Sequence, residues 1–187
     1  MKKTIRKVIG GSIFLSIILI NPWYSGDVSA REHDTKSLTK KIQLKGEKHL
    51  TVKMDIGAGI IDLRRNRTGD ILNAEVEYDP EEIRVDIDYD RIKDEGKLYL
   101  KSKSRHKGLD LDEEDNYWFL EFSHKIPISF EIDVGACEAD FDFTGLKIDK
   151  LDMDLGASSV EVDFRKPNLE RIEKIDIDVG VIELTIT

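Results

Sequence analysis

Cysteine is nearly absent from this chain, which has a single one, Cys137, among 187 residues. An intramolecular disulfide is therefore excluded, and Cys137 is interpreted as a small, partly buried turn residue. The four histidines are scattered, without a cysteine beside them, so a zinc site is not indicated. The motifs G-x-S-x-G, P-loop and G-x-G-x-x-G are also missing, and Ser123 and His124 would face opposite sides of a strand. No catalytic residue and no bound cofactor are predicted.

Long hydrophobic runs are missing too, apart from one of 13 residues between Val8 and Ile20. Four basic residues precede this run, and the small-residue pattern Val28-Ser29-Ala30 follows it. The arrangement predicts a signal peptide over residues 1–30, cleaved after Ala30. An uncleaved anchor is the alternative, although about 20 apolar residues are usual for a membrane span. We expect an exported bacterial protein of the periplasm, the cell surface or the extracellular space, which touches the membrane only if this segment stays attached.

Basic residues are outnumbered, with 29 Lys and Arg against 38 Asp and Glu and a net charge of −9. Removing residues 1–30 takes away four basic residues and Asp27, which leaves −12 on residues 31–187. A charge of this size argues against nucleic acid and anionic membranes as partners. It is unevenly spread, because residues 31–54 carry +4 and residues 55–187 carry −16.

One phrase recurs four times: an alternating stretch, a glycine corner with small residues, and a second alternating stretch. Its clearest copy is the stretch KLDMDLGASSVEVDF, residues 150–164. Alternation with a period of two indicates strands with one buried and one wet face. The corner glycines are Gly57, Gly135, Gly156 and Gly180. Glycine permits a positive φ, and it also lets stacked corners approach closely. The last corner is predicted to be two residues shorter than the others.

The last three glycines are 21 and 24 residues apart, intervals that suit one coil of a stack. Residues 31–127 hold shorter alternating stretches with turn residues between them, around Ala74–Tyr78, Ile83–Tyr89 and Leu98–Leu100. We predict a single all-β domain over residues 31–187. It would be a β-solenoid-like stack of Gly-Ala-cornered repeats in residues 128–187, preceded by an N-terminal antiparallel meander. Within the meander, residues 102–116 are predicted as a surface loop and residues 117–122 as a strand covered on both sides.

Acidic residues occupy outward positions of the repeats and form columns. Two residues before the corner glycine stand Asp55, Asp133, Asp154 and Asp178; four before it stand Lys53, Glu131, Asp152 and Asp176; just beyond it stand Asp62, Asp140, Glu161 and Glu183. Like charges about 4.8 Å apart cost about 1 kcal/mol in water. Each buried apolar side chain contributes more, roughly 1.5–3 kcal/mol, so the columns do not require a ligand.

Three interpretations of these columns stay open. They could be a solvated face that keeps the protein soluble. They could instead be neutralised by the lysine-rich segment 36–53. Finally, they could bind calcium, with Asp133, Asp154 and Asp178 as the candidate ligands, although the nine-residue frame of calcium-binding β-rolls is missing.

The sequence resembles the toast-rack family of bacterial exported proteins. The resemblance lies in the Gly-Ala corners with Asp two residues earlier and in the segment EVEYDP, within the stretches LTVKMDIGAGIIDLR, LNAEVEYDPEEIRVDIDY and IPISFEIDVGACEADFDFTGLKIDKLDMDLGASSVEVDF. It implies a β-solenoid-like stack and brings no catalytic residues. Similar repeats occur in domains tied to envelope stress sensing and in adhesin-like surface domains.

We therefore expect a non-catalytic cell-envelope module that binds a protein or a surface polymer, or that scaffolds an assembly. The alternative is a cation- or glycan-binding adhesin-like surface domain. A polysaccharide lyase is a further alternative, since such enzymes place aspartates and a basic residue on a β-helix. The last copy, residues 175–186, has no polar capping segment after it. This copy predicts self-association through the terminal coil, or a cover supplied by the N-terminal strand.

Overall fold

The structure is a computed structural model that describes residues 35–105, 116–180 and 182–186. The predicted signal peptide lies outside the described residues. The described residues form ten β-strands: β1 (Lys36–Ile42), β2 (His49–Arg65), β3 (Leu72–Tyr78), β4 (Ile83–Ile92), β5 (Glu95–Ser104), β6 (Asn116–Phe122), β7 (Pro127–Asp142), β8 (Lys147–Asp163), β9 (Lys174–Val179) and β10 (Ile182–Ile186). The predicted all-β class is confirmed. In the part of the chain that is described, no helix is long and apolar enough to cross a membrane.

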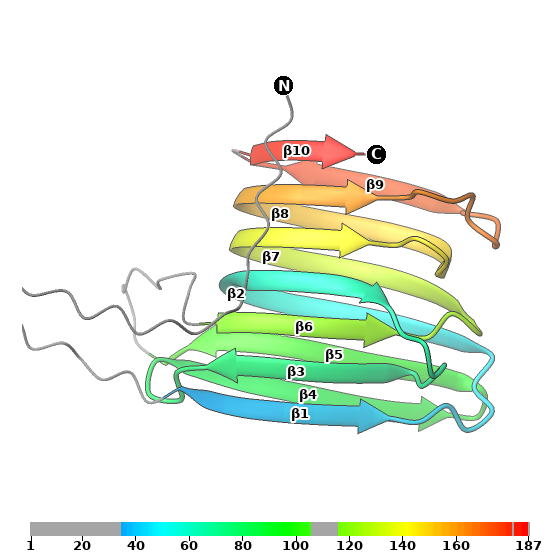
Figure 1. Ribbon diagram of the computed structural model, residues 1–187, viewed down its shortest axis with the longest axis horizontal. Helices are drawn as coiled ribbons and strands as arrows, with labels where there is room; N and C mark the ends of the chain where they lie inside the picture. Colours follow the sequence, from blue (N-terminus) through cyan, green and yellow to red (C-terminus); the bar gives the residue numbers. More distant parts are fainter. Residues whose placement is uncertain (1–34, 106–115, 181, 187) are drawn as a thin grey trace, which may run out of the picture. The chain divides into compact units, whose positions relative to one another are not determined.

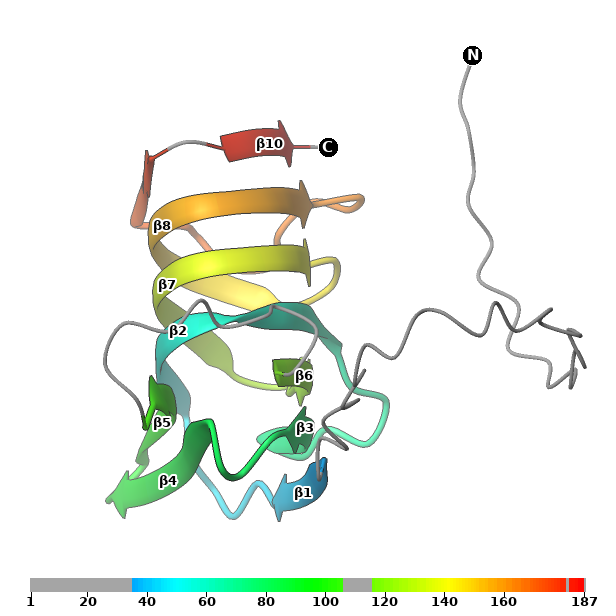
Figure 2. The ribbon, with the colours of Figure 1, turned by 90° about the vertical axis from the view of Figure 1, so that its left-hand side faces the viewer.

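Parallel pairing between bent strands builds the centre of the molecule (Figures 1 and 2). β2, β7 and β8 each bend near their corner glycine, and each lies directly on the next with its residues in register. β9 pairs with the first half of β8 and β10 with its second half. On the other side, β5 pairs with the first half of β2 and β6 with its second half. The four predicted copies are thus joined by a fifth level, made of β5 and β6.

The N-terminal strands close one end of this stack. β4 pairs antiparallel with β5, as the meander predicts, but β3 pairs antiparallel with β6 and with β1. β3 and β4, adjacent in sequence, therefore lie on opposite faces of the stack. The reason is a tight turn after β3, in which Asp79 accepts hydrogen bonds from the amides of Glu81 and Ile83 and redirects the chain to the other face.

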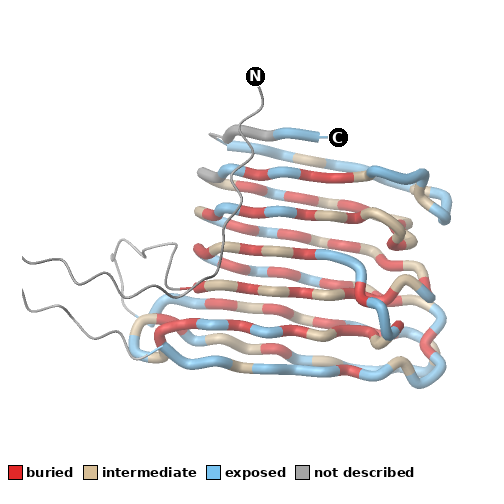
Figure 3. Tube along the Cα trace, viewed as in Figure 1, coloured by how far each residue is buried: buried red, intermediate tan, exposed pale blue. Residues whose placement is uncertain are grey.

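The interior consists of stacked apolar rows, which alternate with exposed residues along each strand (Figure 3). Met54, Ile132, Met153 and Ile177 occupy one row in successive levels. The first three are at most 2% exposed, and Ile177 is half-buried against the same core. The buried interior predicted from the period of two is therefore confirmed.

Two expectations for the region around β6 were wrong in part. Tyr117, Phe119 and Glu121 are only half-buried, because the guanidinium group of Arg64, 4.1 Å from the ring centroid of Phe119, is a partial cover rather than a second layer. Ser102 and Asn116, both assigned to the loop, are buried strand residues. Residues 106–115 of that loop lie outside the described residues.

Close approach of the backbone explains the corner glycines. A Cβ atom at Gly135 would lie 2.4 Å from the carbonyl oxygen of Gly57, and one at Gly156 would lie 2.3 Å from that of Gly135. Neither Gly135 nor Gly156 has a positive φ, whereas Gly59 does, at +149°. At Gly135 and Gly156, glycine is therefore needed because the stacked backbones lie too close for a side chain. Among the described corner residues, a positive φ is the reason for glycine only at Gly59, beside the first corner.

The last corner keeps the spacing of the level below it, so the prediction that it is two residues shorter was wrong. Leu184 lies beside Val160 and Thr185 beside Glu161, the same offset of 24 residues that aligns Ile177 with Met153. The amide of Gly180 donates to the carbonyl oxygen of Leu155 at 2.8 Å, which holds the corner in register. Glu183 consequently stands beside Ser159 rather than in the column of Asp62, Asp140 and Glu161.

Replacing Gly156 by alanine is expected to destabilise the fold by about 1–3 kcal/mol, because the new methyl group collides with a backbone oxygen that has no room to move. Gly57→Ala is the matched control, since no described atom lies within 4 Å of its Cβ position; its effect should stay within about 0.5 kcal/mol. Urea unfolding of both variants measures the difference. Equal losses of stability would show that the glycine contact does not set the stacking.

Two outer faces and a histidine cluster

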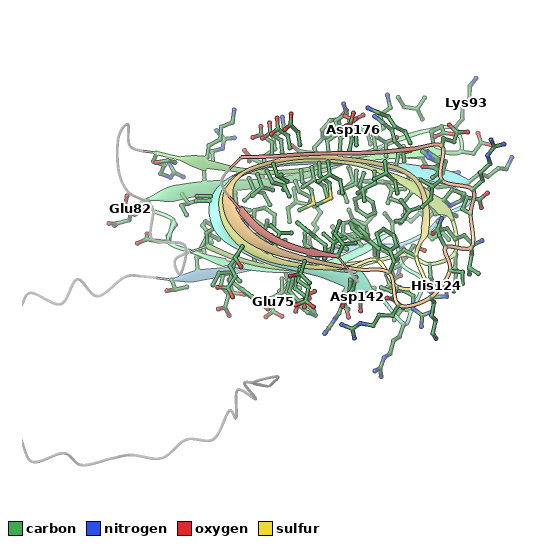
Figure 4. All side chains as sticks on the ribbon, turned by 90° about the horizontal axis from the view of Figure 1, so that it is seen from above. Glu75, Glu82, Lys93, His124, Asp142 and Asp176 are labelled. Atoms are coloured by element: carbon green, nitrogen blue, oxygen red, sulfur yellow. The ribbon has the colours of Figure 1, made fainter. Side chains whose placement is uncertain are left out.

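The stack has two outer faces, which carry different charge patterns (Figure 4). One is formed by the strand segments before the corners, and Asp176 lies on it. The other is formed by the segments after the corners together with β3 and β6, and Glu75 and Asp142 lie on it. We call the first the paired face, defined by Lys53, Glu131, Lys150, Asp152 and Lys174. We call the second the acidic face, defined by Asp62, Glu75, Glu138, Asp140 and Glu161.

Lysines lie beside carboxylates on the paired face, both within a strand and between neighbouring strands. Lys53 Nζ lies 2.5 Å from Glu131 Oε2, and Lys150 Nζ lies 3.1 Å from Asp152 Oδ2. Lys174 Nζ continues the ladder, 3.4 Å from Asp152 and 2.7 Å from Asp176. A hydrogen bond from Lys53 lowers the pKa of Glu131, and one from Lys150 lowers the pKa of Asp152. This face therefore neutralises much of its own charge.

The neutralising lysines come mostly from the repeats themselves. Of the lysine-rich segment 36–53, Lys53 joins the ladder, while Lys41 and Lys48 pair with Asp70 and Asp94 away from it. The hypothesis that this whole segment lies along the acidic columns was therefore wrong. β1 cannot reach the columns because it pairs with β3 at the end of the sheet.

The candidate calcium ligands Asp133, Asp154 and Asp178 stand side by side on the paired face, in register with Asp55. All are exposed. A straight column points its carboxylates in parallel rather than around one point. Within the described ranges, no group of three His, Cys, Asp or Glu side chains is placed to hold a metal ion.

The acidic face is a flat row across successive strands. Glu75, Phe119, Asp62, Asp140 and Glu161 follow one another in register on β3, β6, β2, β7 and β8. The neighbouring row contains Glu77, Tyr117, Ile60, Glu138 and Ser159. A shallow hollow between the rows is lined by residues of both, including Ile60 and Tyr117. Two aromatic rings thus lie between groups of carboxylates.

The carboxylates of this face repel one another. Burial raises the pKa of Asp62, and burial together with the charges of Asp62 and Glu161 raises the pKa of Asp140. Burial and the charge of Asp62 likewise raise the pKa of Tyr117. Arg64 pairs with Glu121 at 3.3 Å, and its charge partly opposes the rise in the pKa of Asp62. A bound cationic group would relieve this repulsion. On the paired face, lysines of the chain itself lie between the carboxylates.

A histidine cluster, which the sequence did not reveal, lies where the strands begin. His49 Nδ1 is 3.0 Å from Glu95 Oε2, and His49 Nε2 is 2.8 Å from Asp149 Oδ2 and 3.1 Å from Ser129 Oγ. Four strands, β5, β2, β7 and β8, supply these groups. Asp149 reaches the cluster because the pairing of β7 and β8 shifts there and leaves Asp149 as the extra residue of a bulge. Aligning the repeats on their corner glycines could not predict the contact between Asp149 and His49, because the bulge adds a residue and shifts the register between the repeats.

The cluster contains a serine, a histidine and carboxylates, but its hydrogen bonds are those of a cross-link. Ser129 Oγ donates to Asp149 Oδ1 at 2.6 Å, so its proton does not point to the imidazole, as activation of a nucleophile requires. Both ring nitrogens of His49 face carboxylate oxygens, Nδ1 that of Glu95 and Nε2 that of Asp149. The cluster therefore ties four strands together through one side chain.

Taken together, the levels in parallel register, the glycine corners and the charged outer faces define an all-β domain of stacked repeats. Residues 31–187 match the family described as the N-terminal domain of toast_rack, DUF2154, and the chain belongs to this family. No curated protein matches the chain.

Solved structures with a similar fold include a candidate cell adhesion protein from Clostridium sporogenes ATCC 15579. Its TM-score is 0.75 at 20% sequence identity, over 81% of this chain and 71% of that chain. A candidate adhesin from Bacteroides fragilis NCTC 9343 matches over 81% of this chain and 77% of that chain, at 12% identity and a TM-score of 0.33. The first likeness supports the fold described above.

The two faces should respond to pH in opposite directions. Because the native pKa of Asp140 is raised, the native state holds its proton more tightly than the unfolded state, so stability falls as pH rises through that range. Asp140→Asn should therefore stabilise the protein at pH 7, by up to about 0.5 kcal/mol. The native pKa of Glu131 is lowered, so its contribution is present above the unfolded value and is lost as pH falls through the native one. Glu131→Gln should destabilise at pH 7, by about 0.2–1 kcal/mol.

Urea unfolding at pH 7 and at about pH 3, where carboxylates are largely protonated, measures both effects. The two differences should shrink at the acid pH. A loss of stability in Asp140→Asn at pH 7 would contradict the electrostatic description of the acidic face.

Replacing His49 by alanine should destabilise the fold by about 1.5–3 kcal/mol. The physical reason is the loss of the hydrogen bonds between the imidazole and the carboxylates of Glu95 and Asp149. His124→Ala is the control, because the buried Nδ1 atom of His124 has no hydrogen-bond partner among the described residues. Thermal unfolding provides the measurement, and equal losses of stability in the two variants would rule out the cross-link.

Proposed function

We propose that this protein is a non-catalytic cell-envelope module that binds a positively charged segment of a partner protein or surface polymer on its acidic face. The observation that carries the proposal is the contrast between two faces of one repeat. Both faces present carboxylates in register, but lysines of the chain neutralise those near Glu131 and Asp152, whereas those around Asp140 repel one another.

The electrostatic argument concerns the centre of the acidic face. Asp62, Asp140 and Glu161 stand on adjacent strands, about 4.8 Å apart. A cation placed between two of them interacts favourably with both, and it reduces their mutual repulsion. Such a site attracts basic partners over a distance that depends on ionic strength.

The shape and the apolar groups of the face favour an extended basic segment. The row from Glu75 to Glu161 crosses five strands without an intervening loop. Phe119 stands in this row and Tyr117 in the neighbouring one, and both side chains are half-buried. Aromatic rings beside carboxylates suit the aliphatic stem and the charged head of lysine or arginine.

Location and family membership are consistent with this role. The N-terminal residues predict export, and a surface domain needs no catalytic group. The same face would serve an adhesin-like domain, the role named for the similar Clostridium structure, if the positively charged partner belongs to another cell. The family resemblance to envelope stress domains adds that the partner could be a sensor protein of the same envelope.

Binding of poly-L-lysine tests the proposal, measured by titration calorimetry at low and at physiological salt. The triple variant Asp62→Asn, Asp140→Asn, Glu161→Gln should bind at least tenfold more weakly than the unmodified protein. The matched control is Asp55→Asn, Asp133→Asn, Asp154→Asn, which removes three charges from the same three strands on the paired face. It should weaken binding less than about threefold.

Equal weakening in the two triple variants would mean that only net charge matters, and it would overturn the assignment to the acidic face. Absence of binding by the unmodified protein at low salt would overturn it as well.

A further inference from the structure

The level formed by β9 and β10 leaves core-facing residues uncovered (Figure 3). Ile175, Val179 and Ile186 are 52%, 38% and 57% exposed. Their register partners in the level below are Leu151, Leu155 and Val162, each at most 1% exposed. Within the described strands, β9 and β10 each pair with β8 alone. The outer edges of β9 and β10 therefore present backbone N–H and C=O groups that can pair with a further strand, next to a row of apolar side chains.

The opposite end of the stack is protected. On β1, Lys36 and Lys40 fall at core-facing register positions, beside Tyr78 and Ala74 of β3, and charges at such positions discourage a further strand. Beneath β4, the buried carboxylate of Glu47 accepts a hydrogen bond from Tyr89 and pairs with Arg91. β9 and β10 have no charged residue at a core-facing position. The end of the stack at β9 and β10 therefore lacks the protection against further strand pairing that the end at β1 and β4 has.

The order of residues on β9 is self-complementary. Its outward residues are Lys174, Asp176 and Asp178, and all are exposed. If a second β9 pairs antiparallel with the first, centred on Asp176, each Lys174 stands opposite Asp178 of the other copy. Ile175 then stands opposite Ile177. The Lys174–Asp178 pair forms twice and outnumbers the single like-charge pair of the two Asp176 side chains at the axis. The row of Ile175 and Ile177 is extended at the same time.

The register of β10 agrees with the same symmetry axis. Asp176 lies four residues before Gly180 and pairs with Asp152, while Leu184 lies four residues after it and pairs with Val160. Both positions are equally far from the corner, so one two-fold axis passes through both strands. Antiparallel pairing centred on Leu184 places Glu183 opposite Thr185, and Ile182 opposite Ile186. A two-fold interface of this kind closes at two copies.

We infer that the edge of β9 and β10 binds a second copy of this protein, by antiparallel pairing of β9 with β9 and of β10 with β10. The result is a dimer in which two stacks join end to end. The exposed side chains of Ile175 and Ile186 become part of one core, and both acidic faces stay exposed.

The oligomeric state of the full-length protein, measured by size-exclusion chromatography with light scattering, tests this interface. The unmodified protein should be a dimer at micromolar concentration. Ile175→Lys should be monomeric, since it places a charge opposite Ile177 of the other copy, within the apolar row. Leu169→Lys is the matched control: Leu169 is 71% exposed but precedes β9, so this variant should remain dimeric.

Cross-linking tests the register independently of stability. Asp176→Cys brings two thiols together at the symmetry axis and should give a disulfide-linked dimer under mild oxidation. Asp154→Cys, on β8 one level below and beside Asp178, should not, and the native Cys137 is buried. A monomeric unmodified protein, oligomers that grow with concentration, dimers that persist in Ile175→Lys, or cross-links at Asp154→Cys alone would each overturn the inference.

Discussion

Contact between glycine corners and the backbone of the neighbouring level is the constraint on which the structure depends. Where Gly135 lies against the carbonyl oxygen of Gly57 and Gly156 against that of Gly135, no side chain fits between the levels. The strands on both sides of the corner are then held in register. That register aligns apolar residues into a continuous core, and it necessarily aligns outward residues into columns as well.

Carboxylates lie in register on both faces of the stack, but their charged neighbours differ between the two faces. On the paired face, Lys150 and Lys174 each contact two carboxylates, so charges of opposite sign lie beside one another along the stack. On the acidic face, Asp140 has Asp62 and Glu161 as neighbours, and its pKa is raised. Burial of the core tolerates this repulsion, since each apolar side chain contributes roughly 1.5–3 kcal/mol.

Local periodicity allowed much of this fold to be predicted. The row of Met54, Ile132 and Met153 and the Asp133 column follow directly from alternation and glycine spacing. Contacts between distant segments could not be predicted in this way. The sequence offers no sign that β5 and β6 together make a level, or that a bulge at Asp149 brings it to His49. The difference between the faces also escaped prediction, because it depends on which lysine reaches which carboxylate.

The order of strands along the stack has a mechanical meaning. From β1 to β10 the path runs through β3, β6, β2, β7 and β8, which is six strand spacings of about 4.8 Å, or roughly 29 Å. Every spacing is set by backbone hydrogen bonds, so the domain behaves as a stiff spacer rather than a flexible tether. The distance between β1 and a molecule bound at the outer edge of β10 would therefore be fixed.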